Sequence, residues 1–320
     1  MTQVKVKAPP PARRVAAAQD ASRNGRRRRM RPTTWAAIGF ALPLVAYLAV
    51  FYAYPLVENV SMSVHRFTRA TFVTGEAPFA GADIYREVIG SAPFWPTVRQ
   101  TAVFVVVSLV FQYGIGLALA VFFQRSFPLS TILRALFLVP WLLPIIVSAT
   151  TWQWMMDADS GVLNSFLGVF GIDPVWWLNA ENSLMSVTIA NIWLGIPFNL
   201  VILYSGLQNV PTELYEAASL DGASRWRQFW SITFPLLRPV TAITLLLGFV
   251  YTLKVVDIIW IMTAGTGTSQ TLATWAYAMA FGKGTAVIQY SQAAVVGTIL
   301  LVIALVMGFV YLAAQRRQED

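Results

Sequence analysis

The chain has no cysteine and a single histidine, His65. The lack of cysteine excludes disulfides, iron–sulfur clusters, thiol catalysis and cysteine zinc sites. One histidine cannot form a multi-histidine metal site or a relay. A G-x-x-x-x-G-K-[ST] phosphate loop is also missing, because the nearest match, Gly282-Lys283-Gly284-Thr285, has no Ser or Thr directly after its lysine. We therefore expect no catalytic residue, metal site or cofactor in this chain.

Charge is scarce as well. Only 12% of the 320 residues are charged, against about 25% in soluble domains, whereas 57% are hydrophobic. The apolar residues are gathered in runs long enough to cross about 30 Å of hydrocarbon. Six such runs are present, at 35–57, 98–123, 132–155, 184–203, 240–262 and 293–312. Because lipid offers no partner to an unpaired backbone group, the sequence predicts an all-α membrane protein with six transmembrane helices.

Prolines interrupt several of these runs, at Pro43, Pro140, Pro144 and Pro197. Such breaks are tolerated where neighbouring helices, water or side chains satisfy the freed carbonyl groups. We expect a packed bundle around a polar path. Pro140 and Pro144, which are four residues apart, should distort the third helix.

The basic residues are distributed asymmetrically. Ten of the 23 Lys and Arg precede residue 32, and alternate sides of the predicted spans carry 17 and five. The positive-inside rule then places both termini in the cytoplasm. We expect a disordered basic arm over 1–32, a transmembrane domain over 33–315 and a cytoplasmic tail over 316–320. The arm could act as a topological anchor, bind anionic lipid or contact a partner, and this asymmetry argues against nucleic-acid binding.

The largest predicted cytoplasmic loop runs from about Gln208 to Pro239. Thr212 can cap a helix there, and Glu213 suits the positive end of the helix dipole. Gly222 is a natural stop, because glycine adopts positive φ freely. A second short helix is expected after it, with an apolar side formed by Trp226, Phe229 and Trp230.

The residue types and spacings in this loop resemble a known motif. Glu216-Ala217-Ala218, Gly222, Ile232 and Phe234-Pro235 follow the "EAA" pattern of binding-protein-dependent ABC importer permeases, in which Leu is usual where Phe234 stands. The resemblance implies a coupling helix that docks in a cleft of a cytoplasmic ATPase. The alternative is that Glu-Ala-Ala is an ordinary helix-forming sequence. The implied coupling residues are Glu216, Ala217, Ala218, Asp221, Gly222, Ile232 and Pro235.

Other segments resemble the carbohydrate-uptake branch, the maltose and glycerol-phosphate permease type. These are 161–168, Trp177-Leu178, Trp193 with Pro197-Phe198, and 257–265, although Thr266 replaces a second glycine of the family. Within that branch the chain is most similar to the first permease subunit of the mycobacterial-type trehalose importers.

The resemblance implies an assembly in the bacterial cell membrane that works by alternating access. Its partners would be a second homologous permease, two ATPase subunits that bind ATP and Mg, and an extracytoplasmic solute-binding protein. The substrate would be a sugar such as the disaccharide trehalose. The alternatives are a stand-alone secondary transporter or channel and a membrane-embedded enzyme.

The fourth run contains a candidate substrate site. Asn191, Leu194, Gly195 and Phe198 lie on one helical face by their i, i+3, i+4, i+7 spacing. An amide, a gap and an aromatic ring suit a sugar, which offers hydroxyls and flat C–H faces. The same residues could instead serve helix packing, with Gly195 permitting close approach. Gly248 is a further candidate in the fifth run.

Lys254 and Asp257 are three residues apart in the predicted fifth span and should share a helical face. Charged residues at such a depth face each other or a cavity. The two side chains could therefore form a pair that stabilises packing, or they could line or gate the substrate path. His65 and the tryptophans near the outer surface are expected to be interfacial residues.

Overall fold

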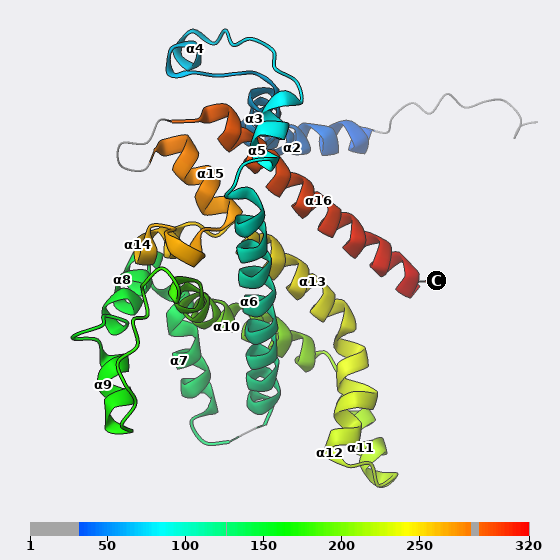
Figure 1. Cartoon of the computed structure of the whole chain (residues 1–320). Helices are drawn as coiled ribbons and strands as arrows, with labels where there is room; N and C mark the ends of the chain where they lie inside the picture. Colours follow the sequence, from blue (N-terminus) through cyan, green and yellow to red (C-terminus); the bar gives the residue numbers. More distant parts are fainter. Residues whose placement is uncertain (1–31, 126, 283–287, 320) are drawn as a thin grey trace, which may run out of the picture. The chain divides into compact units, whose positions relative to one another are not determined.

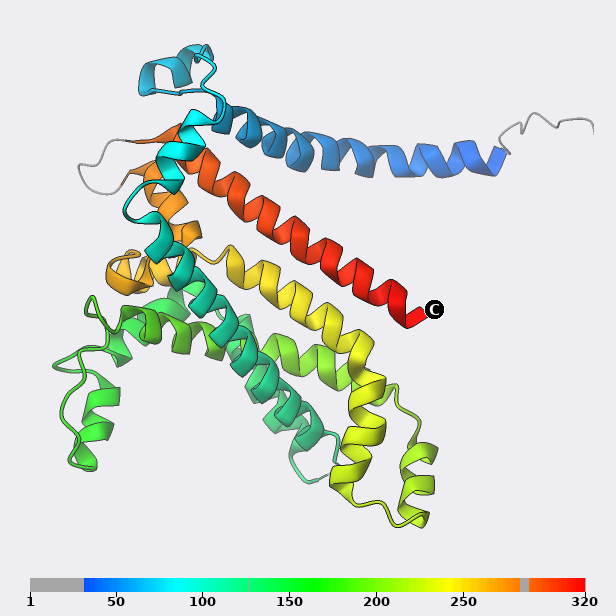
Figure 2. The same cartoon turned by 45° about the vertical axis from the view of Figure 1, so that its right-hand side comes forward.

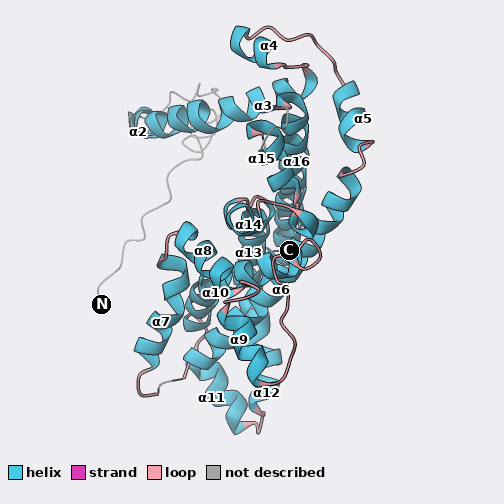
Figure 3. Ribbon diagram, turned by 60° about the vertical axis from the view of Figure 1, so that its left-hand side comes forward, coloured by secondary structure: helices cyan, strands magenta, loops and turns pink. Residues whose placement is uncertain are grey.

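The computed structural model describes residues 32–125, 127–282 and 288–319, so most of the predicted basic arm and Lys283 lie outside the described residues. The described residues form helices joined by loops or running directly into one another (Figure 3). The one β-type pairing among them is an isolated bridge between His65 and Phe79. The all-α prediction is confirmed. Two units, Met1–Val57 and Glu58–Asp320, are distinguished by their internal contacts and are described separately.

The described residues of the first unit form a nearly continuous helix. It contains α2 (Pro32–Leu48), the π-helical turn η1 (Ala49–Ala53) and the start of α3 (Tyr54–Val64). The π turn precedes Pro55, whose ring would clash with the carbonyl of an ordinary helical turn. The residues from Gly39 to Val57 are all exposed, which fits a surface that faces lipid or another subunit.

The second unit contains the remaining long apolar helices (Figure 1). They are α6 (Phe94–Phe123), α7 (Ser130–Leu142), α8 (Ile145–Met155), α10 (Ser183–Gln208), α13 (Phe234–Leu253) and α16 (Tyr290–Glu319). With the first span, Gly39–Val64, the described residues hold five helices able to cross a membrane, or six if α7 and α8 count as one span. The predicted polytopic membrane fold is confirmed, and α16 continues as a helix into the predicted tail.

The third predicted span is sharply broken. Helices α7 and α8 meet at an angle of 95° around Leu143 and Pro144, a larger distortion than a kink. Leu143 is extended, as expected for a residue before proline, so the helix ends there and a new one begins. Pro43, Pro140 and Pro197, by contrast, lie inside continuous helices.

The fifth predicted span, 240–262, differs in position and length from helix α13 of the structure. Helix α13 ends at Leu253, and α14 (Asp257–Thr263) starts a new direction after two valines. The expectation that Lys254 and Asp257 share one helical face is therefore wrong. Asp257 occupies the first turn of α14, where the helix dipole favours a carboxylate. Among the described residues the ion pairs are Arg66–Glu87 and Arg86–Asp83, so Lys254 and Asp257 do not form one.

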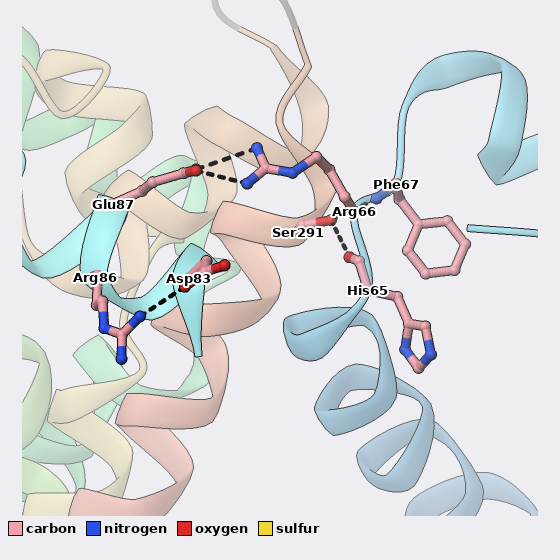
Figure 4. Close-up of polar contacts among 7 residues, drawn as sticks. All are labelled: His65, Arg66, Phe67, Asp83, Arg86, Glu87 and Ser291. Carbon is pink, nitrogen blue, oxygen red and sulfur yellow. Dashed lines mark hydrogen bonds and ion pairs between the residues drawn. The ribbon is translucent and has the colours of Figure 1, made fainter. Parts of the chain in front are cut away.

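Short helices form the predicted outer loops. They are α4 (Arg69–Thr74), α5 (Asp83–Ile89), α9 (Val162–Val169), η3 (Gly267–Ser269) and α15 (Leu272–Phe281). Figure 4 shows how one of these loops is attached to α16. The Ser291 hydroxyl accepts from the Phe67 amide at 2.7 Å and donates to the His65 carbonyl at 2.6 Å. His65 itself contacts its own helix, with Nδ1 2.8 Å from the Ser61 carbonyl.

Candidate functional site

A cavity of about 440 Å³ lies where the break between α7 and α8 faces α10 and α13. Six of the seven predicted pathway residues line it: Asn191, Leu194, Gly195, Phe198, Gly248 and Lys254. Asp257 is not in its wall. The wall is mostly apolar, and its polar groups come from Gln112, Asn191, Tyr251 and Lys254.

Sequence reasoning did not find the other polar and aromatic residues of the wall, which are Gln112, Trp141 and Tyr251. A signal was available for two of them. Gln112 is an isolated amide within the long apolar stretch of α6, and such a group needs a partner inside the bundle. Trp141 follows Pro140 directly, at the point where the helix is about to break. No feature of the sequence distinguishes Tyr251 from the other aromatic residues of the predicted spans.

Helices α6 and α10 cross each other (Figure 1). Residues at this crossing form part of the cavity wall. Gln112 Nε2 donates to the Asn191 carbonyl at 2.9 Å, and Asn191 Nδ2 donates to Ser108 Oγ at 3.0 Å. A Cβ added at Gly195 would overlap the side-chain amide of Gln112. The missing side chain at Gly195 is therefore what admits Gln112 between the helices.

The same pattern continues one turn further along both helices. Gly116 of α6 lies against Asn199 of α10, so that a Cβ at Gly116 would come within 2.5 Å of the Asn199 Cβ. Asn199 Nδ2 donates to the Gly195 carbonyl at 2.9 Å. Small residues that let two backbones approach, together with amides that bond across or along the helices, are typical of membrane helix pairs. Asn191 and Gly195 therefore both pack α6 against α10 and line the cavity.

The rest of the cavity wall is aromatic and carries one charge. Trp141 and Phe198 pack edge to face, with ring centroids 6.3 Å apart. Tyr251 and Lys254 come from the last turn and the end of α13. Lys254 is the C-cap residue of α13, at the negative end of that helix dipole. The cavity can therefore offer flat apolar faces and hydrogen-bond donors to one ligand.

A second candidate site is the helical hairpin after α10. Helix α11 (Thr212–Leu220) is followed by its C-cap residue Asp221 and by Gly222, whose φ is +76°. The Ala223 amide donates to the Ala218 carbonyl at 2.9 Å, and the Gly222 amide donates to the Ser219 carbonyl at 3.1 Å. This is a Schellman ending. The predicted glycine stop is confirmed, whereas the prediction that Thr212 caps the helix is wrong, because Pro211 occupies the cap position and Thr212 is the first helical residue.

The second arm of the hairpin is not a separate helix. Ser224 caps α12 (Arg225–Gln228), which continues through the π-helical η2 (Phe229–Thr233) into α13. Ile232 lies in η2, and Pro235 is the second residue of α13. The π-helical turn directly before it accommodates a ring that would clash with an ordinary helical turn. The expected independent second helix is therefore the beginning of the fifth span.

Three side-chain hydrogen bonds hold the two arms together. The hydroxyls of Tyr215 and Thr233 are 2.9 Å apart. Gln228 Nε2 donates to Ser219 Oγ and to the Ala223 carbonyl, both at 3.0 Å. Within this frame the motif residues Glu216, Ala217, Asp221 and Gly222 are all exposed. The exposed face of α11 is thus free to contact another protein.

Asn164 organises the loop around α9. Its amide nitrogen donates to the carbonyls of Ala158 and Val175, each at 3.0 Å. Its side-chain oxygen accepts from the Val175 amide and from Trp177 Nε1. One buried amide thus joins the segment 161–168 to Trp177. Both belong to the part of the sequence that resembles the carbohydrate-uptake permeases.

Comparison with known proteins extends the resemblance. Residues 112–319 match the family described as "Binding-protein-dependent transport system inner membrane component". The trehalose/maltose transport system permease protein MalF of Thermococcus litoralis is 34% identical over 284 residues, which cover 87% of this chain and 93% of MalF. The diacetylchitobiose uptake system permease protein DasB of Streptomyces coelicolor is 27% identical, with 87% of this chain and 86% of DasB covered.

A solved structure has the same fold. It is a chain of a bacterial alginate ABC transporter in complex with an alginate pentasaccharide-bound periplasmic protein. The TM-score is 0.73 at 20% identity, and the match covers 88% of this chain and 94% of that chain.

Proposed function

Because the chain belongs to the family of binding-protein-dependent transport system inner membrane components, we propose that it is the permease subunit of an ATP-driven importer for a disaccharide of the trehalose type. It is a multi-pass membrane protein of a family distinct from the ATPase subunits of such systems. The observation that carries the proposal is the cavity between α7, α10 and α13, in which aromatic faces and donor groups meet.

The cavity has the chemistry that a neutral sugar needs. Trp141 and Phe198 offer apolar ring faces to sugar C–H groups, and Lys254 and Gln112 offer donors to hydroxyls. Its volume falls in the range of about 300–1,000 Å³ that is usual for small-molecule sites. The similarity to a trehalose/maltose permease supports a disaccharide, and the similarity to a diacetylchitobiose permease supports the wider class of short glycans.

The hairpin supports a role in coupling. We propose that α11 docks on one of two ATPase subunits, which bind ATP and Mg, and that both chain termini lie in the cytoplasm with it. The further partners would be a second homologous permease and an extracytoplasmic solute-binding protein. In this assembly, closure of the ATPases moves α11, and the motion reaches α13 directly because α12 and α13 are one continuous segment. The cavity would then open alternately to the two sides.

Uptake of radiolabelled sugars by a strain that lacks this chain tests the proposal. Complementation with the wild-type chain should restore uptake of one disaccharide from a panel of trehalose, maltose, diacetylchitobiose and glucose. Trp141→Ala and Lys254→Gln should lower that uptake at unchanged membrane levels. Trp95→Ala, at an exposed position outside the cavity wall, is the matched control. Uptake that persists without the ATPase subunits would contradict the proposal and favour a stand-alone transporter.

A further inference from the structure

The hairpin separates its charges between its two arms. Helix α11 and its ending carry the exposed acids Glu213, Glu216 and Asp221, whereas α12 carries Arg225 and Arg227. Neither arginine has an ion-pair partner among the residues that the structure describes. The two arms thus present surfaces of opposite charge. Both arms lie at the N-terminal end of α13 (Figure 2).

Aromatic residues follow these arginines along the same segment. The side chain of Trp226 is 72% exposed and that of Trp230 is 48% exposed. Their ring centroids are 5.7 Å apart, and Phe229 packs against both. One turn separates the two tryptophans, so they lie on one face of the helix. Large exposed aromatic rings beside arginines are unusual on a water-facing surface but common at the headgroup level of a membrane.

The length of the fifth span places this segment at that level. Helix α13 has 20 residues, which span about 30 Å, the thickness of the hydrocarbon core. The nine residues of α12 and η2 precede it in the same helical path. They extend the helix by a further ~13 Å, whereas one headgroup region is only ~5–8 Å deep. Trp230 then lies within the headgroup region, and Arg225 lies just outside it, within reach of its long side chain. Arg225 to Trp230 therefore reach the membrane surface and not the hydrocarbon.

We propose that the segment Arg225–Trp230 binds the headgroups of anionic phospholipids, and that this contact sets the angle at which α11 points away from the membrane. The inference rests on the proposed cytoplasmic position of the hairpin. A negative lipid surface attracts α12 and repels the acidic α11, and the bonds of Gln228 and Tyr215 transmit the orientation between the arms. The lipid contact thus positions the arm that meets the ATPase.

A binding experiment tests the lipid contact without any need for transport. The chain has no cysteine, so Ser231→Cys provides a unique site for a fluorophore beside Trp230. The assembled complex is placed in nanodiscs that contain brominated phosphatidylglycerol or brominated phosphatidylcholine. We expect stronger quenching by phosphatidylglycerol, and a preference that nearly vanishes in Arg225→Gln/Arg227→Gln, because each arginine contributes roughly fivefold to anionic-lipid association.

Arg86→Gln/Arg99→Gln is the matched control, since it removes the same two charges from exposed arginines of α5 and α6. It should keep the wild-type lipid preference. Equal quenching by the two lipids in the wild-type complex would overturn the proposal, and so would an unchanged preference in the double variant. These outcomes do not depend on which sugar is transported, so failure of the lipid inference is distinguishable from failure of the proposed function.

Transport in proteoliposomes then tests the consequence for coupling. We expect substrate transported per ATP hydrolysed to rise when phosphatidylglycerol is added to phosphatidylcholine, and to be independent of that lipid in Arg225→Gln/Arg227→Gln. The ATPase subunits should co-purify with both forms equally. Loss of co-purification in the double variant would mean that the arginines contact the ATPase instead, and it would overturn the proposal.

Discussion

The side chain of Gln112 occupies the space that a side chain at Gly195 would need, and its amide donates to the carbonyl of Asn191 at 2.9 Å. Two helices, α6 and α10, are thus joined at the wall of the cavity by a residue that also lines it. A substitution here changes both the packing of the bundle and the shape of the proposed substrate site. The two effects can be separated, because the packing effect depends on Gln112.

Gly195→Ala should reduce the thermal stability of the purified complex. Overpacking a tight contact costs ~1–3 kcal/mol, and the new methyl group would meet the amide of Gln112. Adding Gln112→Ala should restore part of the loss. Gly114→Ala is the control, since nothing lies within 4 Å of a Cβ at that position of α6. Equal losses of thermal stability in the single and double variants would show that the contact with Gln112 is not the cause of the destabilisation.

Gly195→Leu should in addition block transport by filling the gap between Asn191 and Phe198. Transport per assembled complex is the quantity to measure. A site in the cavity predicts that it falls while ATP hydrolysis stimulated by the loaded binding protein largely persists, because the hairpin is untouched. A lower yield of complex with unchanged transport per complex would favour a packing role alone.

Gly222→Val should abolish most uptake with near-normal expression. The φ of +76° at this residue is unfavourable for a β-branched side chain by ~1–3 kcal/mol, so the Schellman ending should open and α11 should be misdirected. Gly222→Asn is the informative companion, because asparagine tolerates the left-handed conformation and should retain much of the activity. If both variants were equally inactive, the loss would come from the added side chain and not from the backbone.

Glu216→Lys should leave insertion and subunit association intact but uncouple ATP hydrolysis from transport. Glu216 is exposed on α11, outside the membrane helices, so a change of its charge leaves the packing of the bundle intact. The ratio of substrate transported to ATP hydrolysed measures the effect. Glu181→Lys makes the same charge change at an exposed residue of another loop and should be neutral. If Glu216→Lys had the wild-type ratio of substrate transported to ATP hydrolysed, Glu216 would not belong to the coupling surface.

The Arg66–Glu87 pair should give the loop between α3 and α5 a pH dependence. Hydrogen bonds from the Arg66 guanidinium lower the pKa of the Glu87 carboxyl (Figure 4). A lowered pKa means that the pair stabilises the folded loop above the usual glutamate pKa of about 4.3, and that this contribution is lost as pH falls through the lowered value. Limited proteolysis of 66–80 should therefore be constant from pH 7 to 5 and faster near pH 3. In Glu87→Gln this acid-induced step should be smaller.

Asn164→Ala should loosen the loop around α9. The buried amide satisfies two carbonyls, one backbone amide and the Trp177 indole, and leaving such groups unpaired costs ~1–3 kcal/mol. Hydrogen exchange of residues 158–177 should become faster, with little change in the hairpin. Ser165→Ala, one residue away and bonded only to its own helix, is the control. Unchanged exchange in Asn164→Ala would show that the loop is held by its apolar contacts.

The sequence alone determined the features that depend on local chemistry. The length of an apolar run decides whether it can span a membrane, and the left-handed preference of glycine decided the turn at Gly222. The spacing in the hairpin was enough to identify the family. The i, i+3, i+4, i+7 pattern on α10 also placed Asn191, Leu194, Gly195 and Phe198 on the face that lines the cavity.

Tertiary structure decided which helix faces meet and where helices stop. The end of α13 at Lys254 was not visible in a run of apolar residues, because hydropathy is the same on both sides of the break. Gln112 and Trp141 reached the cavity only through the crossing of α6 with α10 and the 95° bend after α7. Periodicity assigns a residue to a face of its own helix, but what that face contacts depends on the placement of other helices, which no local pattern contains.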